Sequence, residues 1–229
     1  MRNYFKYALG EIILVVLGIL IALQVNNWNE DRKKLHEEKS IIEGLKSEFE
    51  SAKKEIIADI EDRNKSIQVV ISTLERHTGK NLTKIPQDSV KYFLDELMQY
   101  RFYTPSHPVL DDLQSSGRFN LIKSEELRFL IRDYIQTKER IKMPEEKERR
   151  FVLEQMAPFL SERIALGKLF ESDQYELDRE KLDHLMNDEF FGSLLYIRKN
   201  TIKSSQQYSR ILLKNIETIQ FELNKNLHD

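Results

Sequence analysis

The sequence predicts an all-α protein in which one N-terminal transmembrane helix continues into a bundle of long antiparallel helices, with shorter helices packed alongside. Three observations lead to this prediction. The stretch from Tyr7 to Val25 is almost wholly apolar, apolar residues recur three and four positions apart over much of the remaining chain, and only seven glycines and five prolines interrupt 229 residues. We divide the chain into a membrane anchor with interfacial flanks, residues 1–29, and a soluble helical domain, residues 30–229.

The apolar stretch has the length and the flanks of a membrane span. About nineteen residues at a rise of 1.5 Å give roughly 28 Å, which is close to the hydrocarbon thickness of a bilayer. Tyr4, Tyr7 and Trp28 bracket the stretch with aromatic rings, which a buried helix of a soluble domain rarely has. A cleaved signal peptide would also begin with basic residues, but no suitable pair of small residues follows Ala22 to guide a signal peptidase.

The span contains candidate contacts for another membrane helix. Glu11 lies about one turn from its start. It either reaches the headgroups and bonds to Tyr7, four residues earlier, or makes a polar contact or proton site against a partner helix. Gly18 and Ala22 form a small-xxx-small pair, and Gly10 lies on nearly the same face. Glu11, Gly18 and Ala22 are therefore the candidate helix–helix contacts.

Residues 31–77 contain no proline and predict one long amphipathic helix that leaves the span as a stalk, with Gly44 as a weak point. Charged residues such as Lys54, Glu61, Asp62 and Arg63 are assigned to its solvent face. Its apolar stripe comprises Leu35, Ile42, Leu45, Phe49, Ala52, Ile56, Ile60, Ile67, Val70 or Ile71, and Leu74.

Capping signals predict three short helices after this stalk. Asp88 or Ser89 can cap the first, and Pro108 suits the first turn of the second. Gly117 is expected to end the second helix in the left-handed conformation. Ser124 can cap the third, because two glutamates follow in its first turn.

The second half of the chain predicts a turn, a charged surface and a final long helix. Pro144 should mark a corner, and Pro158 should kink or end the next helix. The mixed-charge run 145–150 is interpreted as a solvated face, and residues 169–177 as irregular or only briefly structured. Residues 188–227 restore helical spacing and should pair antiparallel with the first helix through Phe190, Leu194, Ile197, Tyr208, Leu212, Ile216, Ile219 and Leu223.

Composition narrows the function classes. Lysine plus arginine number 36 and aspartate plus glutamate 38, which leaves a formal charge of −2 and no basic excess for nucleic-acid binding. The chain has no cysteine, so disulfides and thiolate metal sites are excluded and an oxidising periplasm is compatible with it. The sequence shows no HExxH pair, phosphate-binding glycine loop or nucleophile elbow. We expect no cofactor, no metal, no nucleic-acid partner and no enzymatic activity.

Two segments carry a resemblance to known proteins. The first is residues 7–30, YALGEIILVVLGILIALQVNNWNE, which matches in its polar residues as well as its apolar ones. The second is residues 109–134, through Leu113, Ser115, Ser116, Gly117, Leu121, Ile122, Leu127, Arg128 and Tyr134. Both resemble an uncharacterised family of single-span membrane proteins that is abundant in Bacteroidota. The resemblance implies an inner-membrane protein with its N-terminus in the cytoplasm and its body outside, and it offers no catalytic residues.

Two functions of different class fit these observations. The first is a membrane-anchored, non-enzymatic helical protein whose partners are the lipid bilayer and another envelope component or a second copy. The second is an extracytoplasmic small-ligand sensor that acts through a partner membrane protein, because helical bundles hold ligands between their helices. A pilin-like subunit is a third idea, but the residues expected upstream of Glu11 are missing and Lys6 stands there instead. Local charges leave the orientation open, since basic residues flank the span on both sides.

Overall fold

The computed structural model describes residues 2–77, 86–172 and 175–226, except for the side chains of residues 2–13 and of His77. Every regular element within these ranges is helical, which confirms the all-α prediction. In chain order they are α1 (Arg2–His77), α2 (Gln87–Met98), α3 (Pro108–Ser116), the short 3-10 helix η2 (Arg118–Leu121), α4 (Glu125–Phe151), the π-helix η3 (Val152–Met156), α5 (Ala157–Arg163), α6 (Leu166–Glu171), α7 (Arg179–Met186) and α8 (Glu189–Asn226).

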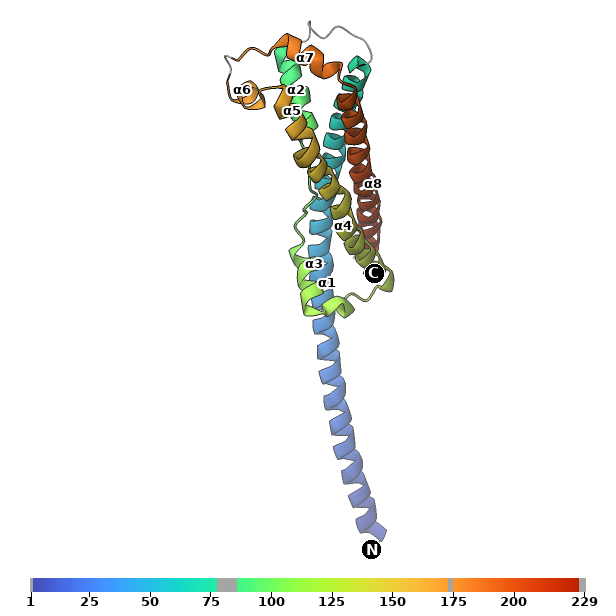
Figure 1. Ribbon diagram of the computed structural model, residues 1–229. Coiled ribbons are helices and arrows are strands. Elements are labelled where there is room, and N and C mark those ends of the chain that lie inside the picture. The colour runs from blue at the N-terminus through green and yellow to red at the C-terminus, as the bar shows by residue number, and fades with distance from the viewer. Residues whose placement is uncertain (1, 78–85, 173–174, 227–229) are drawn as a thin grey trace.

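Three long helices form the body. Helix α8 packs against both α1 and α4, and Figure 1 shows α8 running antiparallel beside α1. The predicted antiparallel pair of long helices is therefore confirmed. The N-terminal part of α1 projects well beyond the bundle, while α2, α5, α6 and α7 gather at the opposite end (Figure 1). Its 76 residues make α1 about 110 Å long.

The bundle contains two separate apolar cores. The lower core, nearer the projecting part of α1, joins residues 42–60 of α1 to residues 212–223 of α8 and to the start of α4. The upper core joins Ile67 and Val70 of α1 to α2, α5, α7 and the first half of α8. The stretches of α1, α4 and α8 between the two cores carry buried polar side chains instead, and this interruption defines the candidate site below.

Several local signals act as predicted. Pro108 lies in the first turn of α3, and Gly117 ends that helix with φ of 68°, a conformation that glycine adopts without steric cost. The Ser124 side chain caps α4 by accepting a hydrogen bond from the Leu127 N–H at 3.1 Å. Gly44 is not a weak point, because α1 continues through it and a Cβ there would lie 2.9 Å from a Val109 methyl carbon. Its small size lets α3 approach α1.

Other local predictions are wrong. Pro144 marks no corner, since α4 runs through it to Phe151 and Pro144 is itself buried. The missing hydrogen bond of an internal proline costs about 3 kcal/mol, which the buried contacts of the neighbouring turns offset. Helix α2 starts at Gln87 with Pro86 before it, so neither serine nor aspartate caps it. The helix does not end before Pro158, where the chain widens into the π-helix η3. By contrast, the prediction for residues 169–177 agrees with the structure, because the described part of this segment contains only the end of the short helix α6.

Candidate functional site

Between Leu14 and Val25, the projecting part of α1 carries apolar side chains on every face, and all of these residues are exposed. Its nine large aliphatic side chains between Leu14 and Val25 are 48–73% exposed. Consecutive exposed residues lie 100° apart around a helix, so this exposure covers the whole circumference. Within the described residues, no helix combines the length and the apolarity that crossing a bilayer demands.

The predicted site residues all lie on this projecting part. Tyr7, Gly10 and Glu11 belong to α1, but their side chains lie outside the described residues. Gly18, Ala22 and Val25 are exposed, and a Cβ on Gly18 would meet nothing within 4 Å. Trp28 is 65% exposed, with the Arg32 guanidinium 6.0 Å from its ring centroid. The described fold therefore leaves this face open, and no described element tests the proposed helix–helix contacts.

A second candidate site was not predicted. Between the two apolar cores lie five charged side chains, none more than 9% exposed, from three long helices. We call this set the charge layer; its members are Asp59, Arg63, Glu145, Glu148 and Arg198. Burying an ion costs several kcal/mol unless it is paired and hydrogen-bonded, so the pairing within the layer decides whether the bundle tolerates it.

Arg63 of α1 stands at the centre of the charge layer. Its Nε donates to both oxygens of Asp59, at 3.0 and 2.9 Å, and its terminal nitrogens donate to Glu148 at 2.7 Å and to Glu145 at 3.1 Å. The same guanidinium also donates to the Arg101 carbonyl at 3.2 Å. Every nitrogen of this buried group thus has a partner, which is the condition for burying an arginine.

Arg198 of α8 completes the charge layer and fixes the chain between α2 and α3. It donates to Glu148 at 2.9 Å and to the carbonyls of Leu97, at 3.1 Å, and Gln99. Glu148 therefore bridges two arginines from two different helices. Because the two arginines also donate hydrogen bonds to these carbonyls of Leu97, Gln99 and Arg101, the layer fixes the C-terminal end of α2 and the start of the connection to α3.

Glu145 is a carboxylic acid of the charge layer whose buried position favours the protonated form. Burial raises its pKa to about 7, against the opposing effects of the Tyr103 backbone N–H and Arg63. Both of these donors bond to the same oxygen, Oε1, at 3.0 and 3.1 Å, which leaves Oε2 free to carry a proton. Two arginines face three carboxylates in the layer, so protonation of Glu145 would bring its formal charge from −1 to zero.

Three uncharged polar side chains, His107, Tyr134 and Tyr103, lie in and beside the lower core. His107 Nε2 is 2.7 Å from the Tyr134 hydroxyl, and the Tyr103 hydroxyl donates to the Ala52 carbonyl at 3.2 Å. Burial lowers the pKa of His107 to about 4, helped by the positive charge of Lys138. His107 Nδ1 is buried without a hydrogen-bond partner among the described atoms. The histidine is therefore held neutral and acts as a core residue.

Glu48 supplies a cap that sequence spacing does not reveal. Its two carboxylate oxygens accept from the backbone N–H groups of Val109 and Leu110, in the first turn of α3. A helix leaves its first N–H groups without partners inside the helix, and here α1 provides the acceptors. The burial of Glu48 raises its pKa despite these two bonds.

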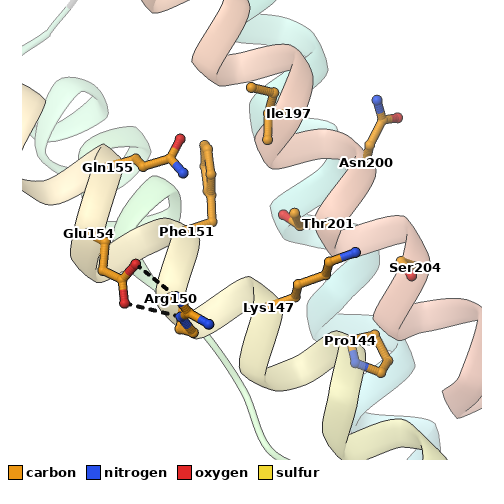
Figure 2. Close-up of a pocket in the computed structure, with 10 residues that line it drawn as sticks. All are labelled: Pro144, Lys147, Arg150, Phe151, Glu154, Gln155, Ile197, Asn200, Thr201 and Ser204. Atoms are coloured by element: carbon orange, nitrogen blue, oxygen red, sulfur yellow. Dashed lines mark hydrogen bonds and ion pairs between the residues drawn. The ribbon is translucent and has the colours of Figure 1, made fainter.

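A surface pocket of about 510 Å³ lies between α4, the π-helix and α8 (Figure 2). We call it the α4/α8 pocket; it is lined by Pro144, Lys147, Arg150, Phe151, Glu154, Gln155, Ile197, Asn200, Thr201 and Ser204. Its volume falls in the range of small-molecule sites. Ile197 was expected to face the core together with Phe190, but they are 41% and 59% exposed, and Phe191 and Leu195 are buried instead.

The charge layer corrects two interpretations of the sequence. Arg63 was assigned to a solvent face and is fully buried, and the run 145–150 was read as solvated although Glu145 and Glu148 are 1% exposed. A signal was present, because Arg63 follows Ile60 by three residues and precedes Ile67 by four. A charged residue in the register of an apolar stripe indicates a buried ion pair when a second helix shows the same feature, as Arg198 does before Ile202.

No three potential ligands in the described part of the chain gather around a metal position. No curated protein and no solved structure matches the chain. Residues 11–137 match the Family of unknown function (DUF6090), a range that covers α1 from Glu11 onward, α2, α3 and the first half of α4. Since this match covers more than half of the sequence, the chain belongs to the DUF6090 family.

Proposed function

We propose that this protein is a membrane-anchored, non-enzymatic helical protein that binds another component of the bacterial envelope. The single observation that carries the proposal is the all-round apolar surface of α1 between Leu14 and Val25, which no described element covers. Aliphatic residues favour insertion by about 0.3–0.6 kcal/mol each at the centre of a span. Nine of them contribute roughly 3–5 kcal/mol, and the apolar sequence of residues 7–13 extends the stretch.

The continuity of α1 supports a mechanical link between anchor and body. The helix passes from the apolar stretch into the lower core without a break, so the body would stand at a fixed height and direction above the bilayer. We propose that the N-terminus is cytoplasmic and the body periplasmic, with the inner membrane as the location. Large exposed side chains on the body, such as Phe129, Met143 and Phe221 at 64–75% exposure, are available for a partner.

Membrane fractionation tests the anchor. The native protein should remain with membranes after carbonate washing and should float with liposomes. A variant with Leu17→Lys and Leu20→Lys should move to the supernatant, because each lysine at mid-span costs about 2.5–3.5 kcal/mol. The matched control, Lys33→Leu and Lys34→Leu, leaves the apolar stretch intact. Release of the native protein by carbonate would refute the proposal.

Cysteine labelling tests the orientation. The chain has no cysteine, so a single engineered one is the only reactive thiol. Lys225→Cys, in the last turn of α8, should react with a membrane-impermeant maleimide in intact spheroplasts, whereas Asn3→Cys should react only after lysis. The opposite pattern would place the body in the cytoplasm.

Affinity capture tests the interaction. Full-length protein in mild detergent should recover a repeatable envelope partner, or behave as a homo-oligomer by light scattering. A strictly solitary monomer in detergent and in nanodiscs would contradict the interaction role while leaving the anchor untouched.

The α4/α8 pocket favours a second function, an extracytoplasmic small-ligand sensor that signals through a partner membrane protein. Lys147 and Ile197 line the pocket next in sequence to Glu148 and Arg198 of the charge layer. An occupant would therefore touch residues adjacent to the contacts that hold three helices together. Thermal-shift screening should find a compound that raises the melting temperature. A flat response across all metabolite classes would count against sensing.

A further inference from the structure

We propose that the α4/α8 pocket binds a small organic monoanion with an apolar body, such as an aromatic or branched carboxylate. This inference rests on the second function above and names its ligand class. It depends on the charges around the pocket, on the chemistry of its lining and on its size.

On α4, the charged side chains near the pocket are paired with one another or with the buried arginines, except for Lys147. In the run 145–150, each charged side chain except Lys147 has a described partner. Glu145 and Glu148 bond to the buried arginines, Glu146 pairs with Arg149, and Arg150 pairs with Glu154. No hydrogen bond or ion pair of Lys147 occurs among the described residues, and its side chain reaches from α4 toward α8 in Figure 2. All nearby carboxylates of α4 are thus already engaged by other cations.

The part of α8 that faces the pocket has no acidic residue. Residues 190–216 contain no aspartate or glutamate. The same stretch carries five cations, Arg198, Lys199, Lys203, Arg210 and Lys214. The wall opposite Lys147 therefore supplies no carboxylate for it. The α8 residues that line the pocket are uncharged, and Arg198 behind them is paired with Glu148. An anion that enters the pocket therefore meets Lys147 as the lining charge without a described partner, and opposite charge at a partly enclosed surface favours binding.

The side chains that line the α4/α8 pocket are partly apolar and partly polar. The apolar surface of the pocket comes mainly from Ile197 on α8, which is 41% exposed although it is a large aliphatic residue, while Phe151 and Pro144 on α4 line the pocket as largely buried side chains. Asn200, Ser204 and Gln155 lie around it and have no described hydrogen-bond partner within the chain. This mixture of an apolar surface and a few polar groups is typical of small-molecule sites. An apolar body would cover Phe151 and Ile197 while its anionic group faces Lys147 and the polar side chains.

The π-helix contributes to the shape. Glu154 and Gln155 belong to η3, where the wider turn shifts the chain relative to a regular α-helix. Single π-turns within α-helices occur frequently at functional sites. The pocket's lower wall is the regular turn around Pro144 and its upper wall is this π-turn, so the irregularity falls within the pocket.

Photoaffinity labelling of the full chain in nanodiscs tests the proposal. The probe is 4-benzoylbenzoate, an aromatic monoanion, with neutral 4-methylbenzophenone as its comparison. We expect saturable labelling by the anion, with adducts mapped by mass spectrometry to peptides containing Phe151 or residues 197–204. The neutral probe should label these peptides several-fold less and should favour the apolar part of α1.

Three variants separate binding in the pocket from non-specific labelling. Lys147→Gln should weaken saturable labelling about two- to fivefold, the size expected for loss of one exposed ion pair. Lys142→Gln makes the same charge change on α4 outside the pocket and should leave labelling unchanged. Ser204→Trp should abolish labelling by filling the pocket, with the far-ultraviolet circular dichroism spectrum as a check on folding.

The outcomes distinguish this proposal from the sensor function. Equal labelling of Lys147→Gln and native protein, equal labelling by the neutral probe, or labelling that never saturates would overturn the ligand class. If anion labelling fails while another metabolite class raises the melting temperature, sensing stands and the anion is wrong. If labelling succeeds but the bound anion does not change the binding of a partner protein, the proposed anion site is supported and the proposed sensor function is contradicted.

Discussion

The opposed titrations of Glu145 and His107 make a sharp prediction about stability. Burial raises the pKa of Glu145 from 4.5 to about 7, so the folded state holds a proton that the unfolded state has lost. The stability linked to this proton is fully present below pH 4.5 and is lost as the pH rises toward 7. His107 behaves in the opposite sense, because its pKa falls from 6.5 to about 4 on folding. Its contribution is present above pH 6.5 and is lost as the pH falls toward 4.

The two effects cancel between pH 4.5 and 6.5. Each group changes the free energy of unfolding by about 1.4 kcal/mol per pH unit in this window, with opposite sign. Over these two pH units each contributes roughly 2.7 kcal/mol. Glu145→Gln removes one titration, so its stability should rise with pH by that amount relative to native protein. His107→Gln removes the other, so its stability should fall by a similar amount, and the double variant should again follow the native profile.

Urea unfolding of the full chain in a non-ionic detergent, followed by circular dichroism at 222 nm from pH 4.5 to 6.5, measures these slopes. Other titrating groups are common to all four proteins and drop out of the differences. Parallel curves for Glu145→Gln and native protein would refute the reasoning, because they would mean that Glu145 ionises in the fold as readily as in the unfolded chain.

Three further substitutions test separate parts of the fold by the same unfolding measurement. Glu148→Ala leaves two buried arginines short of a partner and should lower the free energy of unfolding by about 3–5 kcal/mol. Arg150→Ala, on the surface of the same helix, should change it little. Equal effects of the two substitutions would contradict a stabilising role of the charge layer. Gly44→Ala drives a methyl group against Val109 and should cost about 1–3 kcal/mol, and Val109→Ala should rescue it, so a harmless Gly44→Ala would disprove the close approach. Ser124→Ala should cost about 1 kcal/mol through the lost cap of α4, a loss that Ser124→Asp should avoid.

The helix boundaries that depend on apolar spacing or on a nearby residue can be predicted from the sequence. The extents of α1 and α8 followed from apolar spacing, and the signals at Pro108, Gly117 and Ser124 act within one or two turns of the chain. The helix through Pro144 could not be predicted, because the lost hydrogen bond is a local effect whereas the packing contacts that offset it come from other helices.

The charge layer could not be deduced in the same way. Arg63 finds its carboxylates 82 and 85 residues later, and Glu148 finds Arg198 another 50 residues on. A single sequence shows charged residues within apolar stripes, but it does not reveal which of them meet. The α4/α8 pocket likewise depends on the π-turn and on the exposure of Ile197, which follow from how α4 and α8 are rotated against each other.

The position of the charge layer limits how the bundle can move. If α1 slid along α4 by one helical turn, about 5.4 Å, Arg63 would keep Asp59 of its own helix but leave Glu145 and Glu148, at a cost of several kcal/mol for each stranded ion. Piston-like sliding is therefore blocked while the ions remain paired. Tilting or twisting of the helices about the charge layer displaces these pairs less than sliding does, so the layer resists axial movement of α1 more than angular movement.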